Sequence, residues 1–142
     1  MPGACVFCQI AAGKLPARKV METDRCVAFL DNRPLFPGHV LLIPREHYDT
    51  LPDLPAADVA SLFQASQALT RAVQTALDAD GTFVAINNRV SQTVPHLHVH
   101  VIPRRFKDGL KGFFWPRTPY RDEAHSEEVQ HAIQAALKPL GY

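Results

Sequence analysis

The stretch His96-Leu97-His98-Val99-His100-Val101-Ile102 places three histidines at alternate positions. The residues between them are apolar, and Val and Ile favour β-strands. Successive side chains on a strand point to opposite faces of the sheet. We therefore expect the imidazoles to line one face while the apolar side chains pack the other. Because imidazole titrates near neutral pH, three on one face indicate a metal site or phosphoryl-transfer chemistry.

The pattern on either side of this stretch predicts an α+β fold with a five-stranded, mainly antiparallel sheet. One long helix is expected over 55–77, where apolar residues recur at three- and four-residue steps. A C-terminal helix is expected over 126–137, with Ser126 as its N-cap. The remaining expected elements are a short helix at 7–12, strands at 18–23, 26–30, 40–43 and 82–86, and the histidine strand itself.

Composition narrows the class of protein. The 142 residues carry a formal net charge of +1, which gives no electrostatic reason to expect nucleic acid or an anionic membrane as a partner. No apolar run approaches the roughly 20 residues of a membrane span, and the N-terminus lacks the features of a signal peptide. We therefore expect a cytoplasmic protein. Its three cysteines are an odd number, which argues against a disulfide framework.

The chemistry of imidazole favours a two-step transfer. A neutral imidazole can attack phosphorus and later leave it, and its flanking neighbours can donate hydrogen bonds to phosphate oxygens. His98 has a histidine two residues away on each side and is therefore the expected nucleophile. Gln92 and Thr93 lie just upstream and offer uncharged donors.

This arrangement resembles the motif of the histidine triad (HIT) family. Gln92-Thr93-Val94 before the histidines and Pro103-Arg104 after them look like its fragile-histidine-triad branch, the dinucleoside polyphosphate hydrolases. The resemblance extends to Phe29-Leu30-Asp31-Asn32, to the stretch 37–44 and to Asn87. It implies a HIT-like fold and one HIT domain over residues 1–142, with an N-terminal zinc-binding segment at 1–13 and a C-terminal extension at 105–142.

The resemblance also implies roles for individual residues. His98 would attack the α-phosphate of a dinucleoside polyphosphate or nucleoside phosphoramidate, and water would hydrolyse the nucleotidyl-histidine intermediate. His100 would contact the α-phosphate, while His96 and His39 would support the orientation of the catalytic imidazole. A polyphosphate substrate could bring magnesium with it. The resemblance implies that Gln92 and Thr93 contact phosphate or the leaving group, that Asp31 contacts the ribose and that Asn87 contacts the nucleotide. It also implies an apolar base slot of Phe7, Ile10, Phe29 and Leu30. Core packing would explain the burial of these four residues equally well.

The loop before Gln92 departs from the family pattern. Family members usually have a longer, glycine-containing loop here, whereas this chain has Asn88-Arg89-Val90-Ser91, with Ser91 in place of the glycine before Gln92. Glycines let backbone amides approach phosphate closely. We therefore expect altered phosphate contacts, with Arg89 as a candidate source of positive charge.

A second candidate site begins with the C-x-x-C pair of Cys5 and Cys8. A redox motif of this kind normally follows a strand, and no strand is expected before Cys5. Two buried thiols are another interpretation. HIT relatives with a structural zinc use matching positions, so the resemblance implies that Cys5, Cys8, His47 and His96 hold zinc in closed tetrahedral coordination.

Three functional hypotheses stay open at this stage. The leading one is the nucleotide hydrolase or nucleotidyl transferase with a covalent histidine intermediate. The second is a metallohydrolase whose catalytic zinc is shared by His96, His98 and His100, although such close ligands on one strand would strain tetrahedral geometry. The third is a non-catalytic nucleotide-binding module. The aromatic run Gly112-Phe113-Phe114-Trp115-Pro116 is expected to pack on its own domain or across a dimer interface. The family resemblance favours the homodimer.

Overall fold

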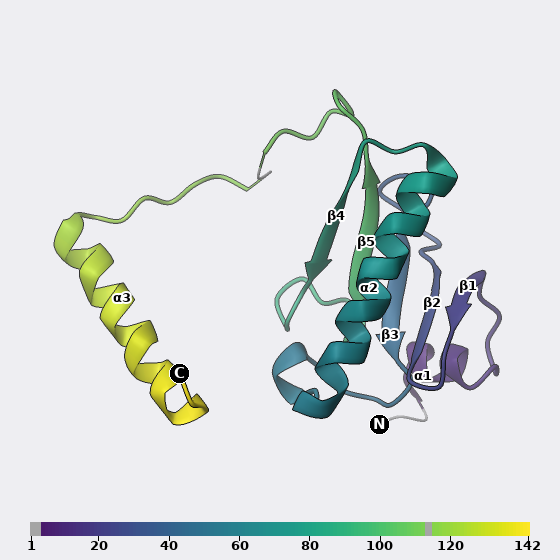
Figure 1. Ribbon diagram of the computed structural model, residues 1–142, viewed down its shortest axis with the longest axis horizontal. Coiled ribbons are helices and arrows are strands. Elements are labelled where there is room, and N and C mark those ends of the chain that lie inside the picture. Colours follow the sequence, from purple (N-terminus) through teal and green to yellow (C-terminus); the bar gives the residue numbers. More distant parts are fainter. Residues whose placement is uncertain (1–3, 113–114) are drawn as a thin grey trace. The chain divides into compact units, whose positions relative to one another are not determined.

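The computed structural model describes residues 4–112 and 115–142, so Phe113 and Phe114 of the aromatic run lie outside the described residues. Five strands form one sheet in the order β1-β2-β3-β5-β4, and each neighbouring pair is antiparallel (Figure 1). This confirms the predicted α+β fold. The elements are α1 (Val6–Ala11), β1 (Lys19–Glu22), β2 (Cys26–Leu30), β3 (Val40–Pro44), η2 (Leu51–Asp53), α2 (Ala56–Leu77), β4 (Gly81–Ile86), β5 (Val99–Arg104), α3 (Glu123–Leu137) and η3 (Lys138–Leu140).

The chain divides into two compact units, residues 1–108 and 109–142. The first unit contains the whole sheet together with α1 and α2, and the second contains α3 and η3. No helix in the described part of the chain is long and apolar enough to cross a membrane. The sequence-based division at residue 105 and the single domain over the whole chain stay predictions.

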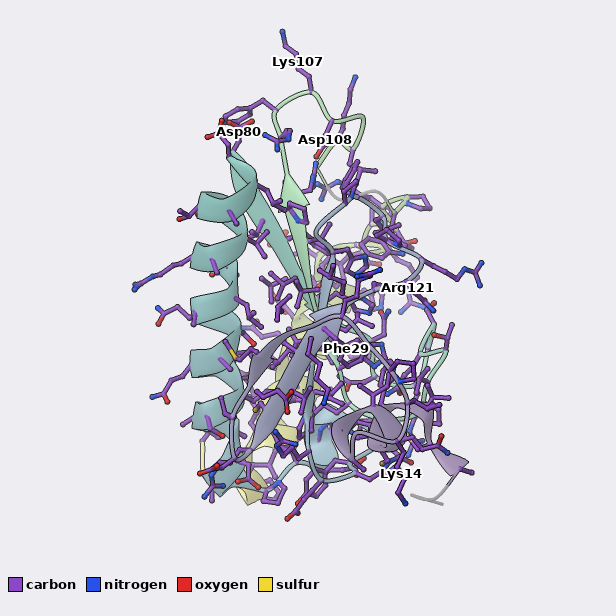
Figure 2. The ribbon with its side chains drawn as sticks, turned by 90° about the vertical axis from the view of Figure 1, so that its right-hand side faces the viewer. Lys14, Phe29, Asp80, Lys107, Asp108 and Arg121 are labelled. Atoms are coloured by element: carbon purple, nitrogen blue, oxygen red, sulfur yellow. The ribbon has the colours of Figure 1, made fainter. Side chains whose placement is uncertain are left out.

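The two faces of the sheet bury different groups of side chains. One face packs against α2, and its core includes Leu42, Leu62 and Leu69 (Figure 2). The other face packs against α1 through Phe7 and Ile10, which meet side chains of β2 and β3. Phe29, labelled in Figure 2, belongs to this second core. The sheet therefore separates a core covered by α2 from a second core covered in part by the short α1.

The histidine stretch differs from its prediction in one respect. Strand β5 begins at Val99, so His96 and His98 precede it. The ladder stops there because β4 pairs with β5 only as far as Ile86 opposite Val99, and the chain then turns away. The alternation nevertheless holds, since Leu97, Val99 and Val101 all lie in the core on the α2 side.

The C-terminal helix starts earlier than the sequence indicates. Helix α3 begins at Glu123, and its N-cap is Asp122 rather than Ser126. The Asp122 carboxylate accepts a hydrogen bond from the backbone N–H of His125 at 2.8 Å, as an N-cap side chain does. The Ser126 hydroxyl instead donates to the carbonyl of Glu123 within the first turn. Both residue types are good caps, so local sequence alone did not separate them.

The turn between β2 and β3 approaches the end of α2 closely at Gly38. Its φ of +98° lies in the left-handed region, and a Cβ added there would stand 2.1 Å from Cδ1 of Leu77. A side chain at this position would therefore meet both backbone strain and a clash.

We expect Gly38→Ala to lower the free energy of unfolding by about 1–3 kcal/mol more than Gly13→Ala does, measured by chemical denaturation. Gly13 is the matched control because it also has positive φ, +75°, but has no atom within 4 Å of the added Cβ. Equal losses in the two variants would show that the approach of Leu77 does not matter.

Candidate functional site

A cavity of about 1170 Å³ lies on the α1 face of the sheet. Its walls come from α1, from β2 and the residues after it, and from the histidine stretch. The residues expected at the nucleotide site that line it are Phe7, Ile10, Phe29, Leu30, Asp31, Thr93, His98 and His100. The structure thus brings together an apolar wall, one carboxylate and two of the three histidines.

The apolar wall is also part of the core. Phe7 packs edge-on against Phe29 with ring centroids 5.4 Å apart. It also packs edge-on against His98 at 5.2 Å. Phe7 and Phe29 are therefore core residues that also line the cavity, and their contact with a base stays a prediction.

The hydrogen bonds of His98 determine which of its ring nitrogens has a free lone pair. Its Nδ1 lies 2.7 Å from the backbone carbonyl of His96. A carbonyl only accepts hydrogen bonds, so Nδ1 carries the proton and donates it. The neutral ring then has its lone pair on Nε2. This is the tautomer that a nucleophilic histidine requires.

His39 fixes the tautomer of His100 in the same way. The backbone N–H of Leu35 donates to His39 Nδ1 at 3.2 Å, so the His39 proton is on Nε2. That Nε2 donates to His100 Nδ1 at 2.9 Å. The proton of a neutral His100 is therefore on Nε2, where it can be donated. His39 does not line the cavity and acts on it through His100.

Burial keeps this pair neutral. Burial, together with the charges of His98 and His39, lowers the pKa of His100 to about 4, although Asp31 acts in the opposite direction. Burial also lowers the pKa of His39, although Asp31, whose Oδ2 lies 3.7 Å from His39 Nε2, acts in the opposite direction. At neutral pH both rings are therefore uncharged donors and acceptors.

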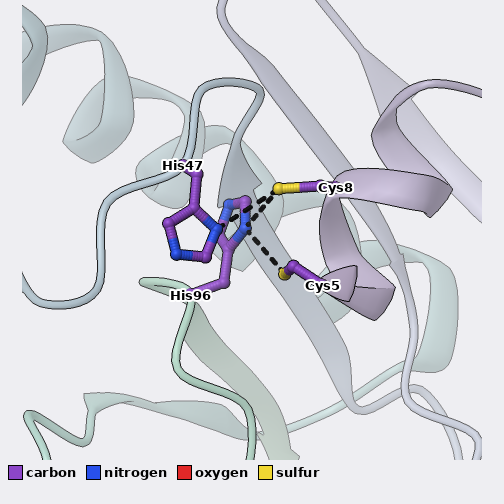
Figure 3. A group of neighbouring side chains, drawn as sticks. All are labelled: Cys5, Cys8, His47 and His96. Carbon is purple, nitrogen blue, oxygen red and sulfur yellow. Dashed lines mark hydrogen bonds between the residues drawn. The ribbon is translucent and has the colours of Figure 1, made fainter. Parts of the chain in front are cut away.

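A second cluster brings together all four residues of the expected metal site (Figure 3). Cys5 and Cys8 come from the start of α1, His47 from the segment after β3, and His96 from the segment before β5. One ligand atom from each lies within 4.8 Å of the others. His96 Nδ1 is 3.5 Å from the sulfur of both cysteines, and His47 Nδ1 is 3.3 Å from Cys8 Sγ.

The orientation of both imidazoles fits a metal ion. His96 Nε2 donates to the Pro44 carbonyl at 2.9 Å, and His47 Nε2 donates to the Asp49 carboxylate at 2.8 Å. In each neutral ring the lone pair is then on Nδ1, which faces the thiols. Burial and the hydrogen bond with Cys5 raise the pKa of Cys8 to about 11, so a thiolate there needs a neighbouring cation. Two thiols and two such imidazoles are a zinc donor set.

Two predicted nucleotide residues lie outside the cavity lining. Gln92 lines a different cavity of about 410 Å³ together with His47, Asp49 and Arg89. Its Nε2 donates to the Asp49 carbonyl at 2.5 Å, and its Oε1 accepts from the backbone N–H of Arg89 at 2.8 Å. Asn87 donates to the carbonyl of Ser91 at 3.5 Å. The sequence did not single out Asp49, whose contacts with Gln92 depend on tertiary structure.

Comparison with known proteins assigns the chain to a family. A HIT domain matches residues 12–107. The chain belongs to the HIT family. It is similar to nucleotide hydrolases of this family, and HIT proteins bind nucleotide substrates.

Relatives of the chain have different substrates. The adenosine 5′-monophosphoramidase hnt1 of Schizosaccharomyces pombe is 32% identical over 135 residues, which cover 92% of this chain and 99% of that protein. The adenylylsulfatase HINT3 of Arabidopsis thaliana is 38% identical over 108 residues, which cover 75% of this chain and only 55% of that protein. The assignment to the dinucleoside polyphosphate branch therefore stays a prediction.

One solved structure bears on the metal cluster. The crystal structure of a zinc-bound histidine triad family protein from Mycobacterium smegmatis is 37% identical and has a TM-score of 0.73. The match covers 93% of this chain and 99% of that chain.

The lowered pKa of His100 predicts a pH dependence of stability. An unfolded histidine takes up a proton near pH 6.5, whereas folded His100 does so only at about 4. The unfolded state therefore binds more protons in this window, and the free energy of unfolding falls as the pH is lowered from about 6.5 to about 4. Above that window the effect is absent.

Denaturant unfolding at several pH values would check this, with His100→Asn as the comparison. Other histidines and carboxylates titrate in both proteins, so the difference between them isolates His100. We expect the advantage of the wild type over the variant to shrink below pH 6.5. A difference that does not change with pH would contradict the assignment.

Proposed function

We propose that this HIT-family protein hydrolyses nucleotide derivatives at the α-phosphate, with His98 as the nucleophile. The observation that carries the proposal is the His98–His96 carbonyl hydrogen bond of 2.7 Å, which fixes the proton on Nδ1 and so puts the lone pair of the neutral ring on Nε2, on a residue that lines the cavity. His98 is also buried against Phe7, which holds the ring in one orientation. A buried imidazole held in one orientation is well suited to attack phosphorus.

The reaction proceeds in two displacements. In the first, His98 Nε2 forms a bond to the α-phosphorus, and the bond from phosphorus to the leaving group breaks with its electron pair. In the second, water attacks phosphorus, loses a proton and displaces the imidazole, which releases the nucleoside monophosphate. His100 Nε2–H donates to a non-bridging oxygen while negative charge develops.

The remaining cavity residues would hold the nucleotide. Asp31 would accept hydrogen bonds from the ribose hydroxyls, and Phe7, Ile10, Phe29 and Leu30 would contact the base. Thr93 lies on the wall beside the histidines and would contact a phosphate oxygen. Gln92 and Asn87 lie outside the cavity lining, and the leaving group would have to extend beyond it to meet them. Candidate substrates are dinucleoside polyphosphates, nucleoside phosphoramidates and adenylated small molecules.

The metallohydrolase alternative has less support. The described residues contain two groups with metal-ligand spacing, namely Cys5 with Cys8, His47 and His96, and Asp31 with His39 and His100. Neither group contains His98, whose Nδ1 is already bonded to a carbonyl. The three histidines of the triad therefore point to different partners instead of a shared ion.

We expect His98→Ala to lower kcat/KM for hydrolysis of adenosine 5′-phosphoramidate at least about a thousand-fold, because the nucleophile is lost. AMP binding, measured by calorimetry, should remain detectable. His125→Ala is the matched control, since His125 is a histidine of α3 that is not among the residues lining the cavity. The same assay with diadenosine polyphosphates and adenylyl sulfate ranks the substrate classes.

Trapping the intermediate tests the covalent step directly. The wild type is incubated with labelled substrate, quenched in alkali to preserve the acid-labile phosphorus–nitrogen bond, and mapped by mass spectrometry. The adenylyl group should be found on His98. Label on another residue would exclude this mechanism, and AMP binding by a wild type without turnover would favour the non-catalytic module.

For the second cluster we propose a structural zinc ion held by Cys5, Cys8, His47 and His96. With four protein ligands the ion supplies a cross-link and no open coordination position for chemistry. It would tie the N-terminal segment and α1 to the segments that flank β3 and β5. The hydrogen bonds of His47 and His96 are the outer contacts that orient metal-bound imidazoles.

Elemental analysis after metal-supplemented expression should find about one zinc ion per chain. Cys8→Ala should lose most of this zinc and unfold at a lower temperature, because metal binding contributes to folding. Cys26→Ala is the matched control, since Cys26 is buried in the core on the α2 side and should leave the zinc content unchanged. Clearly substoichiometric zinc in the wild type would contradict the proposal.

A homodimer and magnesium carried by a polyphosphate substrate also stay predictions. Strand β4 lies at an edge of the sheet, and its Val84 is 41% exposed. A second copy of the chain would pack along this edge strand.

A further inference from the structure

The loop 87–92 has a shape that its sequence does not favour. Arg89 has a φ of 70° and Ser91 a φ of 61°, both in the left-handed region that non-glycine residues adopt at a cost. Such a conformation persists only when surrounding contacts hold it. The contacts that hold this loop therefore decide where Gln92 and the neighbouring Thr93 lie.

Besides hydrogen bonds within the loop, two contacts come from the segment that follows His47. The Asn88 side-chain oxygen accepts from the backbone N–H of Leu51 at 2.9 Å. The Gln92 amide donates to the Asp49 carbonyl at 2.5 Å. Two side chains of the loop are thus bonded to the backbone of residues 49–51.

The same segment is anchored in the metal cluster. The Asp49 carboxylate accepts from His47 Nε2, and this bond turns His47 Nδ1 toward Cys8. Asp49 therefore contacts the metal cluster through its side chain and Gln92 through its backbone. The segment itself is stiffened by Asp53, whose carboxylate accepts from both the backbone and the hydroxyl of Thr50.

We propose that Asp49 is a positioning residue that couples the metal cluster to the phosphate side of the nucleotide cavity. Metal binding fixes His47, His47 fixes Asp49, and Asp49 holds the loop of Gln92 and Thr93. A metal ion and a nucleotide then both favour the ordered loop. Because the first ligand to bind has already ordered the loop, the second ligand binds without that entropic cost. Each ligand raises the affinity for the other by the same factor. The inference rests on the proposed function, because it takes AMP as a ligand of the cavity.

The test measures this coupling factor and not activity. AMP affinity is determined by calorimetry for zinc-loaded and zinc-depleted protein. Zinc affinity is determined by competition with a chelator, starting from loaded protein, with and without saturating AMP. We expect zinc to tighten AMP binding about fivefold or more, and AMP to tighten zinc binding by the same factor.

Two variants locate the coupling at Asp49. Asn88→Ala removes the bond to Leu51 without touching a metal ligand or a cavity-lining residue, and Asp49→Ala removes the bond to His47 but keeps the backbone carbonyl. Asp49→Ala should also weaken zinc binding itself by about 10–100-fold. In both variants we expect the coupling factor to fall toward one. Asp24→Ala, an exposed aspartate between β1 and β2, is the control and should leave the factor unchanged.

The outcomes separate the inference from the proposed function. AMP binding with a coupling factor near one in the wild type would overturn the inference alone. A wild-type factor that both variants keep would also overturn it, because the coupling would then run by another route. No AMP binding at either zinc level would overturn the proposed function and the inference together.

Discussion

One hydrogen bond, from His96 Nε2 to the carbonyl of Pro44, organises both candidate sites. It joins the end of β3 to the segment before β5, beyond the last backbone pairing between these strands. It also fixes the proton of His96 on Nε2, so that Nδ1 faces the cysteines. Because the ring is held, the His96 backbone is held as well, and its carbonyl is the group that orients His98. The metal cluster and the cavity therefore also meet at His96.

Hydrogen bonds orient the two histidines that line the cavity. Two separate sets of hydrogen bonds orient the two rings. In the neutral forms, one set leaves the lone pair of His98 on its Nε2, and the other leaves the proton of His100 on its Nε2. Burial supports this division because it disfavours the charged form of His100. His98 and His100, whose ring centroids are 4.9 Å apart, thus have complementary roles although their residue type is the same.

The sequence predicted those features that depend on a short period or a local motif. Alternating histidines and apolar residues were enough to assign the two faces, and the C-x-x-C pair with the family resemblance was enough to select the four clustered residues. The start of β5 depended on where β4 leaves the sheet, which no local pattern at His96 encodes. The position of Gln92 depended on a contact with Asp49, 43 residues away, and on left-handed backbone at Arg89 and Ser91.

The order in which the metal-cluster residues occur along the chain has a consequence for biogenesis. Cys5 and Cys8 leave the ribosome first, and His96 follows only after both edge strands of the sheet and the long helix have been synthesised. Closing a loop of this length costs entropy that the completed sheet has to compensate. The four ligand atoms therefore come together only when α1, the segment after β3 and the segment before β5 have met, so ion capture by all four requires contacts between distant parts of the chain.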